Sequence, residues 1–241
     1  MRASRVVIRR EAAAMSPHSP RRYVFFDVDE TLISIKSMLS FQEYWFAATG
    51  DLCGKVLFEE DMARLRRGGA SREALNRRYY AHFAGREVAA VEQRATGWFN
   101  HVAATIPGLF HSAVVAALHR HQNQGDRAVL VSGSFPALLA PIARRLGVRD
   151  ILATDLVTAH GRYTGEIRPP QTIGAGKAEV IARFLTARRV PAAQCHAYGD
   201  DLSDLPMLDA VGHPVVVRGS GELEAQALHR GWPVLSPIWE A

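Results

Sequence analysis

The fold follows from one stretch of sequence, Tyr23-Val24-Phe25-Phe26-Asp27-Val28-Asp29-Glu30-Thr31. Four consecutive β-branched or aromatic residues that end at a polar segment predict a buried β-strand over 23–26. Asp27 and Asp29 follow at the carboxyl end of that strand, and parallel α/β sheets bind their ligands beyond the carboxyl ends of the strands. The stretch therefore predicts both the start of an α/β fold and the place of its functional site.

From about residue 105 onward, segments typical of strands alternate with segments typical of helices. Short apolar runs predict strands over 128–131, 151–153, 195–198 and 215–217. Helical periodicity covers most of the sequence between them, and residues 156–167 predict a β-hairpin. Alternating strands and helices predict βαβ units, and therefore an α/β protein with a Rossmann-like parallel sheet at its core.

Residues 35–104 follow a different pattern. Their apolar side chains recur every three or four positions, as in Leu75, Tyr79 and Phe83. This spacing predicts four successive amphipathic helices, and the aromatic residues among them indicate the core of a bundle. We therefore expect a core domain over 22–34 and 105–241, interrupted by a helical domain over 35–104.

Two further predicted strands also end in polar motifs. Residues 132–134 read Ser-Gly-Ser, and residues 199–204 read Gly-Asp-Asp-Leu-Ser-Asp. Carboxylates that meet in one crevice repel one another unless a cation lies among them. Oxygen ligands without clustered cysteines or histidines favour a hard ion such as Mg²⁺. The candidate metal ligands are Asp27, Asp29, Asp200 and Asp204.

Two other features suit a phosphate group. Lys177 supplies a positive charge, and Ser132 with the backbone N–H groups of Gly133 and Ser134 lies where a strand passes into a helix, a favourable place for an anion. Each motif alone is common in ordinary turns or on solvated helices. Their joint occurrence, in this order and each next to a strand end or helix, indicates a functional site.

The combination of motifs resembles the haloacid dehalogenase superfamily of hydrolases, and within it the subfamily IB phosphatases that are similar to phosphoserine phosphatase. The resemblance rests on residues 27–31, 131–135 and 199–207 together with Lys177, and it covers about residues 22–217. It implies a Rossmann-like core with an inserted α-helical bundle cap of the C1 type. It also implies an enzyme that hydrolyses a phosphate monoester, with Mg²⁺ as cofactor.

The resemblance implies a chemical role for each motif residue. Asp27 would attack phosphorus and form an aspartyl-phosphate intermediate. Asp29 would protonate the leaving group and later activate the hydrolytic water. The Ser132 hydroxyl, the Gly133 backbone and Lys177 would neutralise the phosphoryl oxygens.

The remaining implied roles concern the metal and its surroundings. Mg²⁺ would be held by the side chains of Asp27 and Asp200 and by the backbone carbonyl of Asp29, whereas Asp204 would hold metal-bound water or orient its neighbours. Thr31 would support the nucleophile loop at the phosphate site. Because family members that cleave carbon–halogen bonds lack the second aspartate, Asp29 favours cleavage of a phosphate ester, by hydrolysis or by transfer to another hydroxyl.

Lys36 is where the sequence departs from phosphoserine phosphatases, which carry at this position a glutamate that holds the substrate ammonium. A lysine cannot pair with an ammonium, so an acidic or hydroxylated leaving group, such as a sugar, a polyol or a carboxylate-bearing metabolite, suits the site better. Lys36 is thus a candidate substrate-binding residue, and the alternative is that it points into solvent. The helical segment also carries four arginines, Arg64, Arg66, Arg67 and Arg72. They are assigned to a solvated helix face, and the alternative is that they contact the substrate from the cap.

The positive charge of the chain is concentrated at its N-terminus. With 29 Lys+Arg and 24 Asp+Glu the formal net charge is +5, and residues 1–22 hold six arginines and one acid. The remainder is neutral, which argues against a nucleic-acid-binding body. Residues 1–21 are expected to form a disordered basic arm, and no segment has the roughly 20 apolar residues that a membrane span needs.

The number of cysteines also indicates the cellular compartment of the protein. Two cysteines, Cys53 and Cys195, cannot form a disulfide framework, and without a secretory signal they favour the cytoplasm. We expect a monomer or homodimer that acts on a small-molecule phosphate ester, with no nucleic-acid or membrane partner. The alternatives are phosphoserine phosphatase itself, a phosphotransferase with an alcohol acceptor and, more remotely, a non-catalytic binding module on this fold.

Overall fold

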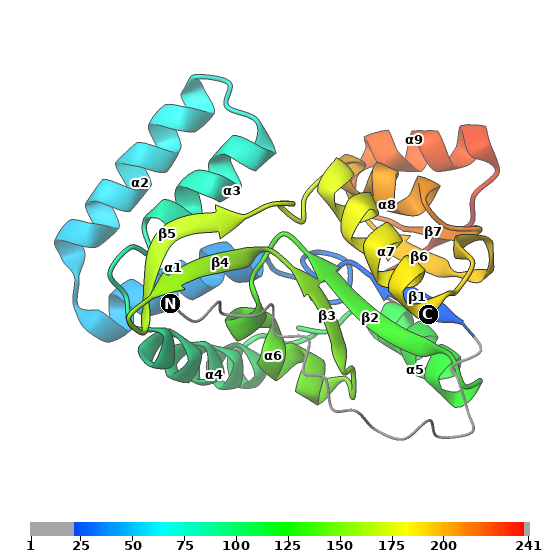
Figure 1. Ribbon diagram of the computed structural model, residues 1–241, viewed down its shortest axis with the longest axis horizontal. Helices are drawn as coiled ribbons and strands as arrows, with labels where there is room; N and C mark the ends of the chain where they lie inside the picture. Colours follow the sequence, from blue (N-terminus) through cyan, green and yellow to red (C-terminus); the bar gives the residue numbers. More distant parts are fainter. Residues whose placement is uncertain (1–21, 239–241) are drawn as a thin grey trace.

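A computed structural model describes residues 22–238, so the basic arm expected over 1–21 lies outside the described residues. Its centre is a sheet of six parallel strands in the order β3-β2-β1-β6-β7-β8 (Figure 1). The predicted α/β class with a Rossmann-like parallel sheet is confirmed. The strands are β1 (Tyr23–Phe26), β2 (Arg127–Ser132), β3 (Asp150–Ala153), β6 (His196–Gly199), β7 (His213–Val217) and β8 (Val234–Leu235).

Helices cover both faces of the sheet because the strands direct alternate side chains to opposite faces. In β1, Val24 and Phe26 pack into one hydrophobic cluster, whereas Tyr23 and Phe25 pack into a second. The first cluster includes α5 (Ser112–Asn123) and α6 (Pro136–Arg145), and the second includes α7 (Ala175–Arg188), α8 (Leu205–Asp209) and α9 (Gly221–Arg230). Two 3₁₀ turns, η1 (Ala192–Gln194) and η2 (Leu202–Asp204), flank β6. Within residues 22–238, no helix is long and apolar enough to cross a membrane.

Four helices lie between β1 and α5, and we call residues 35–105 the helical insertion, one residue longer than the predicted range of 35–104. They are α1 (Ser37–Thr49), α2 (Leu52–Arg67), α3 (Arg72–Ala81) and α4 (Val88–Thr105), so the predicted helical periodicity is confirmed. The ring of Phe41 is central to their aromatic core, with ring centroids of Trp45, Phe83 and Trp98 at 6.2 to 6.3 Å. Phe135, which precedes α6, lies at 6.3 Å from the same ring. The core of the helical insertion is therefore continuous with the packing beside the sheet.

The predicted hairpin is present as β4 (Asp155–Ala159) and β5 (Arg162–Arg168), which pair in antiparallel fashion. Although it follows β3 in sequence, the hairpin lies beside the helical insertion in Figure 1. The segment before α4 pairs with it, because the Gly85 N–H donates to the Tyr163 carbonyl at 2.8 Å and the Tyr163 N–H donates to the Arg86 carbonyl at 2.9 Å. Two separate parts of the chain thus build this side of the molecule.

The strand order brings the three polar motifs to one edge of the sheet. β1 lies between β2 and β6, and Phe26 is in register with Leu130 of β2 and with Tyr198 of β6. Since these strands are parallel, the segments that follow them leave the sheet side by side. The residues after β1, β2 and β6 therefore share one edge.

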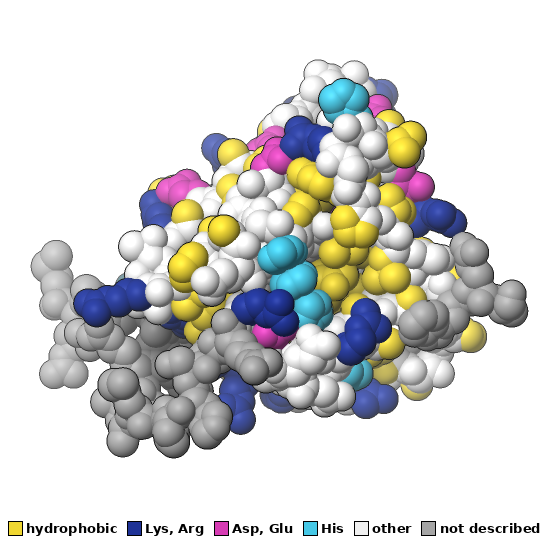
Figure 2. All heavy atoms as spheres, turned by 90° about the vertical axis from the view of Figure 1, so that its right-hand side faces the viewer, with side chains coloured by type: hydrophobic (Ala, Val, Ile, Leu, Met, Phe, Trp, Pro, Cys, Tyr) yellow, Lys and Arg dark blue, Asp and Glu magenta, His cyan; other side chains and the backbone are white. Residues whose placement is uncertain are grey.

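The opposite edge of the sheet carries a row of histidines. His196 and His213 begin β6 and β7 with their ring centroids 4.6 Å apart, and His121 of α5 lies 4.7 Å from His196. Figure 2 shows histidine side chains in a line on this side of the molecule. Burial, the two neighbouring histidines and Arg22 together lower the pKa of His196 to about 4, against the opposing effect of Asp126. In the folded protein, His196 therefore stays neutral at pH values where an ordinary histidine is protonated.

We predict that His196 makes the folded state less stable on acidification. Between pH values of about 6.5 and about 4, the unfolded chain binds a proton at this position and the folded protein does not, so the free energy of unfolding falls as the pH falls. In His196→Gln, the loss of melting temperature between pH 7.5 and pH 5, measured by scanning calorimetry, should be smaller than in the unchanged protein. His119→Gln, at an exposed histidine of α5, is the control and should keep the original pH dependence. Parallel profiles for His196→Gln and the unchanged protein would contradict the prediction.

Candidate active site

Three buried carboxylates meet where β1 and β6 end. Asp27 follows β1, Asp200 follows β6, and Asp204 ends η2. One carboxylate oxygen of each lies within 4.8 Å of the others, and each residue is at most 6% exposed. Of the four aspartates predicted as metal ligands, the structure thus brings three together, and the side chain of Asp29 is not part of this group.

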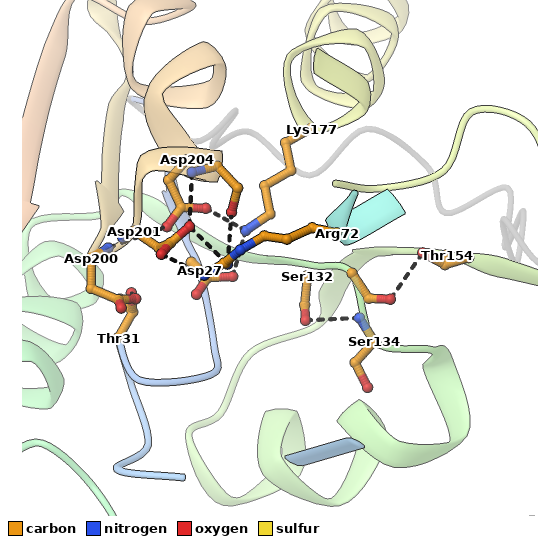
Figure 3. Close-up of polar contacts among 12 residues, drawn as sticks. Asp27, Thr31, Arg72, Ser132, Ser134, Thr154, Lys177, Asp200, Asp201 and Asp204 are labelled. Carbon is orange, nitrogen blue, oxygen red and sulfur yellow. Dashed lines mark hydrogen bonds and ion pairs between the residues drawn. The ribbon is translucent and has the colours of Figure 1, made fainter. Parts of the chain in front are cut away.

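Lys177 holds two of these carboxylates together (Figure 3). Its ammonium group donates to Oδ1 of Asp27 at 2.6 Å and to Oδ1 of Asp204 at 2.5 Å. The lysine lies in the first turn of α7 and its side chain is buried. Burial opposes the charged form, but the two carboxylates outweigh burial and raise the pKa of Lys177 above its ordinary value. Lys177 is therefore a charged link between the first and the last motif.

Both carboxylate oxygens of Asp204 are engaged. Its Oδ1 accepts from Lys177, and its Oδ2 accepts from the backbone N–H groups of Asp200 and Asp201, each at 3.2 Å. Gly199 makes room for this arrangement, because a Cβ at that position would lie 2.6 Å from the Cβ of Asp204. These contacts favour a role for Asp204 in orienting the Asp200 segment over direct coordination of a metal ion.

The three carboxylates carry more negative charge than Lys177 neutralises. Burial raises the pKa of Asp27 against the opposing effect of Lys177, and Asp204 and Asp200 raise it further. Burial also raises the pKa of Asp200 to about 7. Raised pKa values mean that the ionised carboxylates need additional positive charge. A hard divalent ion with oxygen ligands supplies that charge, so these residues fit Mg²⁺.

Thr31 contacts the carboxylate of Asp200 and does not line the cavity. Its hydroxyl donates to Oδ1 of Asp200, and the ring Nδ1 of His111 is hydrogen-bonded to its backbone oxygen at 2.9 Å. Thr31 is fully buried and is not among the residues that line the cavity. The structure therefore places its hydroxyl where it orients Asp200, and not at the predicted phosphate site.

The loop after β2 brings the predicted phosphate-binding residues to the same cavity. Ser132, Gly133 and Ser134 all line it, as do Asp27 and Lys177. The Ser132 hydroxyl accepts a hydrogen bond from the backbone N–H of Ser134 at 3.0 Å. Asp27, Lys177 and the segment 132–134 thus face one space.

The helical insertion holds this loop through side chains that no motif contains. The Gly133 carbonyl accepts hydrogen bonds from the Asn76 amide at 3.0 Å and the Tyr80 hydroxyl at 2.6 Å, both on α3. Thr154 donates to the same carbonyl at 3.0 Å. Three donors on one carbonyl fix the orientation of the peptide between Gly133 and Ser134. Helical periodicity places Tyr80 in a core, but it contains no signal for this polar contact.

Asp29 lines the cavity apart from the buried carboxylates. Its Oδ1 is buried without a hydrogen-bond partner among the described residues. Burial raises the pKa of Asp29 to about 6, although Ser37 opposes part of this shift. Such a carboxyl group populates both protonation states close to neutral pH, which suits a group that first donates and then accepts a proton.

The cavity has a volume of about 210 Å³ and lies between the carboxyl edge of the sheet and helices α1 to α3. Lys36, the predicted substrate contact, lines it with its ammonium group 3.1 Å from the Glu30 carboxylate. Arg66 and Arg72 also line it, in contrast to the solvated face that we expected. Arg72 reaches Asp201 at 2.8 Å and so links α3 to the loop after β6 (Figure 3).

Comparisons with known proteins agree on one family. Residues 24–209 match the family model described as haloacid dehalogenase-like hydrolase. A probable phosphatase of Mycobacterium tuberculosis is 34% identical over 222 residues, which cover 90% of this chain and 75% of that protein. A phosphoserine phosphatase of the same species is 27% identical over 216 residues, 87% of this chain and 69% of that protein. A crystal structure of a protein of unknown function from Bordetella pertussis has a TM-score of 0.78 and 26% identity, covering 91% of this chain and 100% of that chain.

We predict that Asp200 contributes to binding of Mg²⁺. Asp200→Asn keeps the size of the side chain and an acceptor for Thr31 but removes one negative charge from the buried group. The affinity for Mg²⁺, measured by isothermal titration calorimetry, should fall by about tenfold or more.

Asp201→Asn is the matched control, since the Asp201 carboxylate binds Arg72 and is not one of the three clustered carboxylates. Its affinity for Mg²⁺ should stay close to that of the unchanged protein. Unchanged affinity in Asp200→Asn would refute the proposed metal site.

Proposed function

The chain belongs to the haloacid dehalogenase-like hydrolase family and is a phosphatase, and we propose that it hydrolyses a small phosphate monoester with Mg²⁺ through an aspartyl-phosphate intermediate. The observation that carries this proposal is the buried pair of Asp27 and Lys177 at the wall of a cavity that Asp29 and Ser132 also line. A carboxylate nucleophile, a proton donor and phosphate-binding groups thereby surround one space. The convergence of the complete set argues against a non-catalytic binding module.

Asp27 is the proposed nucleophile. Lys177 donates to its Oδ1, which leaves Oδ2 to attack phosphorus. A bond forms between Oδ2 and phosphorus while the bond from phosphorus to the ester oxygen breaks on the opposite side. Burial of Asp27 disfavours its ionised form, and the positive charge of Lys177 favours that form.

Asp29 is proposed to donate its proton to the leaving oxygen as that bond breaks. Water then attacks the phosphoryl group, Asp29 accepts a proton from it, and inorganic phosphate leaves as the Asp27 carboxylate is regenerated. The pKa of about 6 supports this role, because an aspartate with an ordinary pKa is almost fully ionised near neutral pH. An alcohol in place of water would give phosphotransfer, which product analysis with an added alcohol distinguishes from hydrolysis.

The phosphoryl oxygens are proposed to bind the Ser132 hydroxyl, the Gly133 N–H and the Lys177 ammonium. These donors face the place where negative charge develops in the transition state, so they lower the barrier more than they strengthen ground-state binding. Asn76 and Tyr80 support this arrangement through the Gly133 carbonyl, since they hold the loop in one orientation.

The metal site is proposed to consist of the Asp27 and Asp200 carboxylates and the backbone carbonyl of Asp29. When bound, Mg²⁺ supplies positive charge that offsets both the carboxylates and the phosphoryl oxygens. Asp204 and Thr31 act as positioning residues, because their hydrogen bonds orient Asp200.

The size of the cavity supports a proposal for the substrate, and the free cysteines support a proposal for the cellular compartment. A volume of about 210 Å³ suits a small ester. Lys36 is kept as a substrate-facing residue, with Glu30 as its partner. Cys53 and Cys195 are both free thiols, which fits a reducing compartment such as the cytoplasm.

We predict that Asp27→Asn abolishes turnover. The variant keeps the shape of the side chain but removes the nucleophilic charge, so phosphate release from p-nitrophenyl phosphate in the presence of Mg²⁺ should fall by at least about a thousandfold. Asp209→Asn changes an exposed carboxylate that pairs with Arg230 and should retain normal turnover. Retention of activity by a folded Asp27→Asn protein would sink the assignment.

We predict that Asp29→Asn affects esters according to their leaving group. The value of kcat/KM reports the steps up to departure of the alcohol. p-Nitrophenolate is a weak base and leaves without protonation, whereas an alkoxide is a strong base and needs a proton from a general acid. For benzyl phosphate the loss of kcat/KM should be about a hundredfold or more, and for p-nitrophenyl phosphate it should be much smaller. Equal losses for the two esters would show that Asp29 is not the general acid.

A further inference from the structure

Beyond the catalytic groups, most of the cavity wall is apolar. Phosphorus must lie beside Asp27 for attack, so the leaving group extends toward the helical insertion. The side chains that form this part of the wall are Met38 and Leu39 of α1, Met62 of α2, Leu75 and Tyr79 of α3, and Ile173 before α7. Contact with this wall favours a leaving group with an apolar body.

The polar groups of α3 that lie among these apolar side chains already have partners. The Tyr79 hydroxyl donates to the Met38 carbonyl at 2.8 Å. The Asn76 amide donates to Gly133 and accepts from Gln171 at 2.6 Å. The hydroxyl groups of a sugar or polyol would therefore lose their hydration here without gaining equivalent hydrogen bonds, which is unfavourable.

Most of the cationic side chains of the cavity are also paired. Lys36 binds Glu30, and Arg72 binds Asp201. Lys177 is held by the carboxylates of Asp27 and Asp204. Among the described cationic side chains that line the cavity, this leaves Arg66 without a hydrogen-bond or ion-pair partner.

Arg66 lies next to the apolar wall. It is four residues after Met62, so the two side chains occupy the same face of α2 on successive turns. Met62 is buried, whereas Arg66 is exposed at the rim of the cavity. A leaving group that fills the apolar part thus ends near a free guanidinium group.

We infer that the leaving group has an apolar body and carries a second anionic group, a carboxylate or a phosphate, which binds Arg66; this inference rests on the proposed phosphatase function. A guanidinium group binds either anion through paired hydrogen bonds. An ammonium group on the leaving group would lie near the positive charge of Arg66 and near the ion pair of Lys36 with Glu30. The described residues of the helical insertion that line the cavity include no carboxylate to bind it. Phosphoserine, sugar phosphates and polyol phosphates are therefore poorer substrates than an anionic, apolar ester.

The test uses benzyl phosphates, whose leaving alcohols have similar acidity. One ester carries a para carboxylate, a second carries a para phosphonomethyl group, and the neutral reference carries a para carboxamide. We expect kcat/KM of at least one anionic ester to exceed that of the carboxamide by about tenfold. The anionic ester with the higher kcat/KM shows whether the second anionic group of the substrate is a carboxylate or a phosphate. We also expect kcat/KM of unsubstituted benzyl phosphate to exceed that of phosphoserine, glucose 6-phosphate and glycerol 3-phosphate by about tenfold.

Arg66→Gln should reduce the ratio between the anionic and the carboxamide ester to near one. Arg67→Gln is the matched control, because Arg67 is the adjacent exposed residue of α2 and does not line the cavity. It should leave the ratio as it is. A ratio that persists in Arg66→Gln would overturn the assignment of Arg66.

The outcomes separate this inference from the proposed function. Release of phosphate from p-nitrophenyl phosphate with no preference for an anionic ester, or with a preference for phosphoserine or the sugar phosphate, would overturn the inference alone. No release of phosphate from any ester would overturn both. The comparison of substrates with the unchanged protein does not depend on the folding of any variant.

Discussion

The site depends on one buried ammonium group between two buried carboxylates. Lys177 joins Asp27 to Asp204, and all three are almost inaccessible to solvent. Removal of one partner from such a group leaves an uncompensated buried charge, at a cost of about 3–5 kcal/mol. With Asp200 beside them, the carboxylates still exceed the available positive charge, so the same arrangement that orients Asp27, the proposed nucleophile, also creates the demand for a cation.

The parallel sheet makes this arrangement possible. β1 is flanked by β2 and β6, so the segments after these strands leave the sheet as neighbours although they are far apart in sequence. Gly199 then allows Asp204 to approach the end of β6, and Thr31 orients Asp200 from the loop after β1. The carboxyl edge of the sheet is thus a rigid frame for groups of like charge that would otherwise separate.

The helical insertion contributes to the site in two ways. Its helix α3 reaches the core at two points, through Asn76 and Tyr80 to the Gly133 carbonyl and through Arg72 to Asp201. The position of the insertion is therefore coupled to the orientation of the loop proposed to bind phosphate. It also supplies most of the apolar wall of the cavity. In the proposed function, the sheet edge therefore carries the chemistry and the helices select the leaving group.

The sequence by itself determined the types of the elements and the residues of the motifs. Apolar periodicity reports which side chains are buried within one helix or strand, and the polar residues that directly follow predicted strands identified Asp27, Ser132 and Asp200. Only the tertiary structure decided which partners these residues have. Arg72 and Asp201 are 129 residues apart in sequence, and Asn76 and Gly133 are 57 residues apart. Local sequence patterns carry no information about contacts over such separations. From sequence alone, a single Arg or Asn on a helix is predicted to be exposed to solvent. Only the fold shows that a hydrogen-bond acceptor lies opposite its side chain.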